Sequence, residues 1–229
     1  MTSIMNEPLS EQQTVDNDLS LTQETTTKPM SVWRLVLPLA IQAALIMAIP
    51  AQAVYTHITG RTLILQTVPV DPYDLLRGYS QILRYDISST DRLKKLPGWS
   101  DLAKQYPGGN EYSPLKEGTN LYVILEEQKS STGNIPKAWK PVQVSINRPS
   151  NLTANQVALK GKYRYGSVSY GLETYYMPED QRDKINNEIA QARPNKPGQL
   201  QPIVMEVKVD TAGKSVPVSM WVQERNYRF

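Results

Sequence analysis

LVLPLAIQAALIMAIPAQAVY, residues Leu35 to Tyr55, is the stretch that decides how this chain is organised. No Asp, Glu, Lys or Arg lies between Arg34 and Arg61. An α-helix rises about 1.5 Å per residue, so a run of this length can cross a hydrocarbon layer of roughly 30 Å. Trp33 and Tyr55 flank the run, as aromatic residues do at a lipid–water interface. The sequence therefore predicts a single transmembrane helix, with residues 35–55 contacting the lipid bilayer.

A cleaved signal peptide is the alternative interpretation of the same stretch. Pro50 followed by Ala51-Gln52-Ala53 is typical of a cleavage site. However, the polar segment before the run is longer than a usual signal-peptide start, and the apolar residues continue past Ala53. Pro38 and Gln42 are both tolerable in a span, because Pro38 falls in the first turns and one amide costs less than a charge. These observations favour a retained anchor.

The chain is predicted to have three parts. Residues 1–31 are polar and without periodicity, so we expect a disordered tail. Residues 32–56 form the anchor, and residues 60–229 form one extracytoplasmic domain, either periplasmic or lumenal, with the N-terminus cytoplasmic. Acids outnumber bases in the tail, whereas the remainder of the chain is basic. The positive net charge of the remainder is consistent with ordinary solubilising charge, or with attraction to anionic lipid or an acidic partner.

The domain beyond Gly60 shows the alternation and turn residues of a strand-rich fold. Residues 157–165 and 168–176 predict a hairpin that turns at Gly166-Ser167. The segment 91–117 is rich in Pro and Gly, which predicts a long excursion with one helical turn near 101–105. Further strands are predicted at 62–68, 79–88, 121–126, 141–147, 203–209 and 216–222.

One helix is predicted within this domain. Pro178 begins it, because proline suits the first helical position, and the acids that follow complement the positive end of the dipole. Ile185, Ile189 and Ala192 form its apolar stripe. The predicted fold class is therefore α+β: a mainly antiparallel β domain with one amphipathic helix, preceded by a single transmembrane helix.

The residue types exclude several kinds of catalytic site. The chain has no cysteine, so it has neither disulfides nor a thiolate nucleophile. His57, the single histidine, lies beside the predicted membrane exit, which disfavours a Ser-His-Asp triad and histidine-based zinc sites. A pair of carboxylates stays open, although solvated surface acids are the simpler interpretation. We predict no cofactor and no metal. The acids considered for such a pair are Glu126, Glu127, Glu173, Glu179 and Asp180.

A run of bases and aromatics at residues 160–165 is compatible with a stacking surface for single-stranded nucleic acid. On a strand, however, Lys160, Lys162 and Arg164 share one face, and Tyr163 and Tyr165 share the other. We therefore expect a half-buried strand with a charged outer face, and no nucleic-acid partner.

The segment 70–78, VDPYDLLRG, concentrates turn residues before the second predicted strand. Pro72 fixes φ and Gly78 permits positive φ, so the turn is well defined. Arg77 can clamp Asp71 or Asp74 through its fork of donors. Two interpretations stay open: a self-locked structural turn, or a binding cleft floored by Asp71, Arg77 and Tyr85.

Two blocks of sequence resemble the GDYXXLXY family of membrane-anchored bacterial proteins. The first is DPYDLLRGYSQILRY at residues 71–85, and the second covers Tyr165-Gly166 and residues 170–179. Tyr79 and Ser80 depart from the motif's Asp and first Tyr. The residues singled out as a structural motif or cleft are Asp71, Asp74, Arg77, Gly78, Leu83, Tyr85, Gly171, Glu173, Tyr175, Tyr176 and Glu179.

The resemblance implies a retained N-terminal anchor and no particular activity. Membrane-bound signal peptidases share a loose similarity of shape, but they need a serine ahead of such a turn, and no Ser lies between Ser31 and Ser80. We expect a non-catalytic binding or scaffolding module at the membrane, with a multipass membrane protein as partner. The alternative is a membrane-anchored hydrolase that uses carboxylates near Asp71 and Glu173.

Overall fold

The computed structural model describes residues 32–68, 80–110, 112–128, 135–176, 179–192 and 202–228. The chain divides into two compact units, Met1–Leu45 and Ile46–Phe229. The described part of the first unit is mainly the start of α1 (Trp33–Thr59). The predicted disordered tail, residues 1–31, lies outside the described residues.

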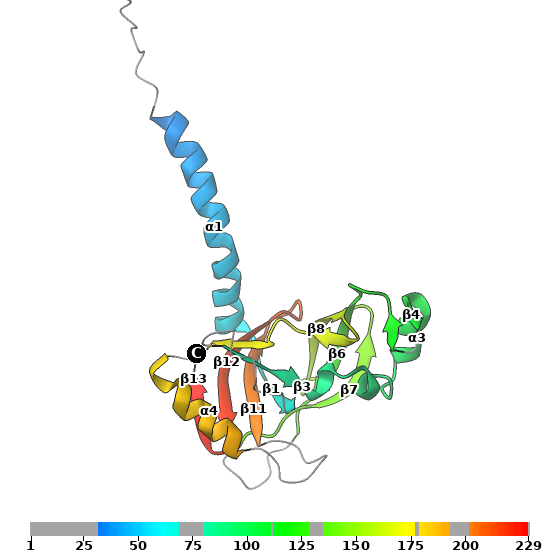
Figure 1. Ribbon diagram of the computed structural model, residues 1–229. Helices are drawn as coiled ribbons and strands as arrows, with labels where there is room; N and C mark the ends of the chain where they lie inside the picture. Colours follow the sequence, from blue (N-terminus) through cyan, green and yellow to red (C-terminus); the bar gives the residue numbers. More distant parts are fainter. Residues whose placement is uncertain are drawn as a thin grey trace, which may run out of the picture. The chain divides into compact units, whose positions relative to one another are not determined.

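Helix α1 covers the whole of the predicted span (Figure 1). Among the described residues, no single helix is both long and apolar enough to cross a membrane. Trp33–Ala48 and Pro50–Thr59 meet that requirement together, with a bend of 40° between them. Proline explains a bend at this point, because its ring removes a backbone donor and clashes with the preceding turn. The transmembrane helix remains a prediction.

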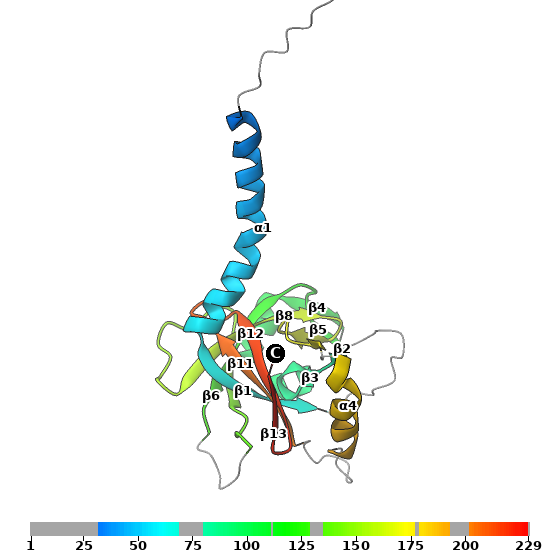
Figure 2. The ribbon, with the colours of Figure 1, turned by 90° about the vertical axis from the view of Figure 1, so that its left-hand side faces the viewer.

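The described part of the second unit contains two large antiparallel sheets (Figures 1 and 2). One has the order β13-β12-β11-β1-β3, and the other has the order β7-β6-β8-β9. Two smaller sheets pair β10 with β2 and β4 with β5. The first sheet is built from β1 (Arg61–Val68), β3 (Arg84–Tyr85), β11 (Ile203–Val209), β12 (Ser215–Val222) and β13 (Arg225–Arg228). The second is built from β6 (Asn120–Glu126), β7 (Lys140–Ser145), β8 (Gln156–Arg164) and β9 (Ser167–Ser169). The remaining strands are β2 (Ser80–Ile82), β4 (Pro107–Asn110), β5 (Ser113–Leu115) and β10 (Thr174–Tyr176).

The two large sheets share one hydrophobic core. Strand β1 has five consecutive buried residues, Leu63 to Thr67, so both of its faces are covered. Backbone hydrogen bonds join the two halves of the unit: the Trp139 amide donates to the Ile64 carbonyl at 2.9 Å, and the Lys160 amide donates to the Gly213 carbonyl at 2.8 Å.

The α+β class with mainly antiparallel sheet is confirmed. The predicted amphipathic helix is α4 (Arg182–Gln191), and the acids expected in its first turn instead lie in a short 3-10 helix, η2 (Glu179–Gln181). Of the predicted apolar stripe, Ile185 is buried, Ile189 is partly buried, and Ala192 is buried just after the end of α4. The carboxylate of Glu188 accepts hydrogen bonds from Arg225 and Tyr227, which ties α4 to the edge strand β13. The helical turn expected near 101–105 is present as α3 (Trp99–Gln105). Two further short helices, η1 (Asp86–Ser88) and α2 (Thr90–Leu93), were not predicted.

The prediction of one strand over residues 79–88 is wrong. The chain forms β2, breaks at Leu83, continues as β3 and then turns into η1. Strand β2 pairs with β10, whereas β3 pairs with β1, so the backbone changes partner within three residues. At the break, the Leu83 amide donates to the Glu173 carbonyl at 2.7 Å, and the Leu83 side chain enters the core.

The predicted hairpin is present, but its turn lies one residue earlier than expected. Tyr165 and Gly166 have φ values of 50° and 78°, the paired positive values that match the twist of a two-residue hairpin turn. The second arm is short, because β9 ends at Ser169 and Gly171 has a φ of 76°. The alternation of β8 is confirmed from Lys160 to Arg164, whereas Tyr165 is 94% exposed rather than inward.

Candidate functional site

The described parts of the two sequence blocks that carry the family resemblance, residues 80–85 and 170–176, lie side by side. Ile82 pairs with Thr174, and the register continues antiparallel to Ser80 and Tyr176. Tyr85 in β3 adds a side-chain contact between the same two segments, because its hydroxyl donates to the Leu172 carbonyl at 2.7 Å. Residues about ninety positions apart are therefore joined by both backbone and side-chain hydrogen bonds.

Tyr85 and Tyr170 are the buried centre of this contact. Tyr85 is 1% exposed, and the hydroxyl of Tyr170 donates to the Ile87 carbonyl at 2.6 Å. Burial raises the pKa of Tyr85 far above its ordinary value, and the charge of Glu173 adds to the effect. Burial likewise raises the pKa of Tyr170, with smaller contributions from Asp86 and Glu173. Both hydroxyls therefore stay protonated and act as fixed donors.

Two carboxylates border the tyrosines. Glu173 is half-buried, and its Oε1 accepts the Tyr170 amide at 2.5 Å. Asp86 is 8% exposed and forms an ion pair with Arg92 at 3.2 Å. Burial raises the pKa of Asp86, while the Arg92 charge and a hydrogen bond from the Ile87 backbone oppose that shift. Each described carboxylate here therefore already has a structural partner.

The structure describes only some of the remaining predicted site residues. Asp71, Asp74, Arg77 and Gly78 lie outside the described residues, so the turn and the cleft proposed there stay predictions. Tyr175 and Tyr176 lie in β10, Glu179 lies in η2, and Gly171 lies just beyond β9. The hydrolase alternative has no further support from Glu173, whose described contact is the Tyr170 amide.

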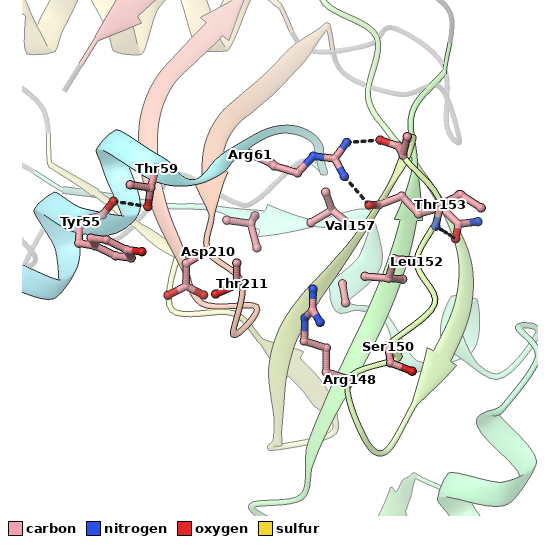
Figure 3. Close-up of a pocket in the computed structure, with 14 residues that line it drawn as sticks. Tyr55, Thr59, Arg61, Arg148, Ser150, Leu152, Thr153, Val157, Asp210 and Thr211 are labelled. Atoms are coloured by element: carbon pink, nitrogen blue, oxygen red, sulfur yellow. Dashed lines mark hydrogen bonds between the residues drawn. The ribbon is translucent and has the colours of Figure 1, made fainter.

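A hollow of about 340 Å³ at the C-terminal end of α1 was not foreseen from the sequence (Figure 3). It is bordered by Tyr55 and Thr59 of α1, by the start of β1, and by the turn after β11. Arg61 fixes its upper wall, donating to the carbonyls of Gln156 at 2.8 Å and of Ala154. Its guanidinium also lies over the Trp139 ring, 6.0 Å from the centroid.

Arg148 contributes a positively charged guanidinium group to this hollow. Figure 3 shows its side chain pointing into the space between Leu152 and Asp210. Among the described residues, Arg148 makes one hydrogen bond, a long one of 3.5 Å to the carbonyl of Pro149. Ser150 and Thr153 also line the wall, and the Thr153 hydroxyl donates to the side-chain oxygen of Asn155 at 2.6 Å. A guanidinium with spare donors can hold a carboxylate or phosphate group.

Asp210 is the acidic residue of the same hollow, and both of its oxygens are engaged. Oδ1 accepts the amides of Ala212 and Lys214 at 2.8 and 2.9 Å, and Oδ2 accepts the Thr56 hydroxyl at 3.3 Å. Nothing in the sequence indicated that Asp210 lies at the end of α1. Within the described ranges, no group of three or more His, Cys, Asp or Glu side chains is placed to hold a metal ion.

A comparison of the sequence with known protein families gives a match that covers both blocks. A protein-family model described as GDYXXLXY protein matches residues 42–220, from within α1 to within β12. No curated protein and no solved structure matches the chain.

Proposed function

The chain belongs to the GDYXXLXY protein family, and from that premise we propose that it is a membrane-anchored, non-catalytic binding or scaffolding protein. Residues 35–55 lie in lipid, the N-terminus is cytoplasmic, and the β-rich domain is extracytoplasmic. The partner is a multipass membrane protein, whose own helices lie in the same bilayer.

The observation that supports this proposal is the exposure of α1. Its large apolar side chains are uncovered around the whole helix, from Trp33 at 76% to Ile58 at 71%, with Leu45 at 68% between them. A helix that is apolar on all sides needs either a protein core or lipid around it. Removing one such side chain from water contributes about 1.5–3 kcal/mol, so covering the whole set exceeds the roughly 5–15 kcal/mol that stabilises a typical domain.

The helix end supports the role of a tether. The Thr56 hydroxyl lies 3.0 Å from the Gln52 carbonyl oxygen and 3.3 Å from Oδ2 of Asp210, so its one proton is shared between these two acceptors. Gly60 lets the chain pass close to β11. The last turn of α1 is therefore fixed to the domain by short contacts, and the hollow with Arg148 lies beside it. An acidic group on a loop of the partner is the chemistry that this hollow fits.

Alkaline carbonate extraction of membranes from cells that express the full chain tests the anchor. Wild type is expected to stay in the membrane pellet with an intact N-terminus. The variant Ile41→Lys/Leu45→Lys is expected to leave the pellet, because each charge at mid-span costs about 2.5–3.5 kcal/mol. Ser100→Lys/Asn151→Lys adds the same charge at exposed positions of the domain and should behave as wild type.

Two outcomes contradict the proposal. Release of the wild-type chain by carbonate means that lipid does not hold α1. A mature N-terminus at Val54 means that the apolar run is a cleaved signal peptide, and the membrane partner then has no basis.

A further inference from the structure

A second hollow, of about 420 Å³, lies over the outer face of β8 and is strongly basic. Its charged lining residues are Lys160, Lys162, Arg164 and Lys214, and no Asp or Glu lines it. None of these four cations has an ion-pair partner in the part of the chain that the structure describes. We name this surface the basic groove.

The backbone brings the four charges together. Strand periodicity places Lys160, Lys162 and Arg164 on one face of β8. The Lys160 amide donates to the Gly213 carbonyl at 2.8 Å, which holds the β11–β12 turn against β8 and brings Lys214 to the same surface. Like charges gathered in this way repel one another, so a bound anion stabilises the arrangement.

Ser215, one of the residues that line the basic groove, has a buried side-chain oxygen without a hydrogen-bond partner among the described residues. It directly follows Lys214 in the chain. A buried hydroxyl in this state is destabilising relative to a bonded one. An oxygen-rich anion in the groove offers acceptors to the three lysines and to Arg164.

The β11–β12 turn connects the basic groove to the end of α1. Asp210 begins that turn and accepts the Thr56 hydroxyl of α1, and Lys214 ends it. If α1 lies in lipid as proposed, its end reaches the level of the headgroups, and the groove lies beside them. We infer that the basic groove binds the phosphate of anionic phospholipid headgroups in the bilayer that holds α1, an inference that rests on the proposed anchor.

The test uses the full chain in a non-ionic detergent, titrated with short-chain lipids and followed by calorimetry. Dioctanoyl phosphatidylglycerol is the anionic probe, dioctanoyl phosphatidylcholine is the neutral control, and sodium phosphate tests a free anion. Wild type is expected to bind the first more tightly than either of the others. Each juxtamembrane cation contributes about fivefold in affinity, so Lys160→Gln/Lys162→Gln/Lys214→Gln should weaken binding on the order of a hundredfold.

The matched control is Lys95→Gln/Lys104→Gln/Lys140→Gln, which removes the same charge from exposed positions outside the groove. It is expected to bind as wild type. An equal loss in both triple variants overturns the inference, because general charge then explains the binding. Equal affinity for sodium phosphate assigns the groove to a free anion, and no binding of phosphatidylglycerol removes the groove as a site. Carbonate extraction reports on the anchor alone, so failure of the anchor and failure of the groove are distinguishable.

Discussion

Tyr85 and Tyr170 show how single hydroxyls hold the domain together. Each donates to a carbonyl more than eighty residues away, Tyr85 to Leu172 and Tyr170 to Ile87. The resemblance singled out Tyr85, but its partner was not predictable, because a strand pattern says nothing of which distant carbonyl a phenol will meet. Tyr170 was noted in the sequence only as part of the block 170–179. No feature of the sequence singled out Asp86 or Arg92.

The raised pKa values of these tyrosines predict loss of stability at alkaline pH. Below about pH 10 both the folded and the unfolded chain hold the phenolic protons. Above it the unfolded chain releases protons that folded Tyr85 and Tyr170 retain, so the free energy of unfolding falls as pH rises. The slope is about 1.4 kcal/mol per pH unit for each tyrosine. Urea unfolding of the full chain in detergent, followed by tryptophan fluorescence at a series of pH values, measures it.

Tyr85→Phe is the control for that slope. It costs about 1 kcal/mol at neutral pH, because the Leu172 carbonyl loses its donor, yet its stability should fall less steeply in alkali. Tyr112→Phe removes a hydroxyl from a residue that is 90% exposed and should change neither value. A slope unaltered by Tyr85→Phe contradicts a protonated, buried hydroxyl at this position.

The larger strands and the helix α4 could be predicted from the sequence, and the short irregular ones could not. Regular periodicity over six or more residues placed β1, β6, β8, β11 and β12 within a residue or two. Strands β2 and β3 were merged because Leu83 fits an apolar pattern, although it marks a change of partner strand. Strands β4, β5 and β13 are short, and their identity depends on the neighbours that pair with them.

The junction between α1 and β1 gives a prediction at the same scale. A Cβ at Gly60 would lie 2.4 Å from the Thr56 carbonyl oxygen and 3.0 Å from the Val209 amide nitrogen, both backbone atoms. Gly60→Ala is therefore expected to destabilise the chain by about 1–3 kcal/mol, since helix end and strand must separate. The midpoint of urea unfolding in detergent measures the loss.

Gly109→Ala is the matched control, because a Cβ there meets nothing within 4 Å. This variant should leave the free energy of unfolding within about 0.5 kcal/mol of the wild-type value. Equal midpoints for the two alanine variants contradict the close approach of α1 to β11.

At the scale of the whole molecule, the sequence established an apolar helix and a β-rich body, and the structure added the surfaces beside the helix end. The hollow with Arg148 and the basic groove border opposite ends of the β11–β12 turn, through Asp210 and Lys214. Neither was predictable, since each gathers residues from strands distant in the sequence. The proposed function depends on what surrounds the exposed apolar side chains of α1.

The absence of cysteine makes the most direct measurement possible, because one introduced thiol is the only one in the chain. The full-length Leu45→Cys variant is exposed, in intact membrane vesicles, to a membrane-impermeant maleimide, alongside Asp101→Cys in an exposed part of the domain. If residues 35–55 lie in lipid, Leu45→Cys stays unlabelled until detergent is added, while Asp101→Cys is labelled when the reagent is present on its side. Labelling of Leu45→Cys in vesicles without detergent contradicts the account.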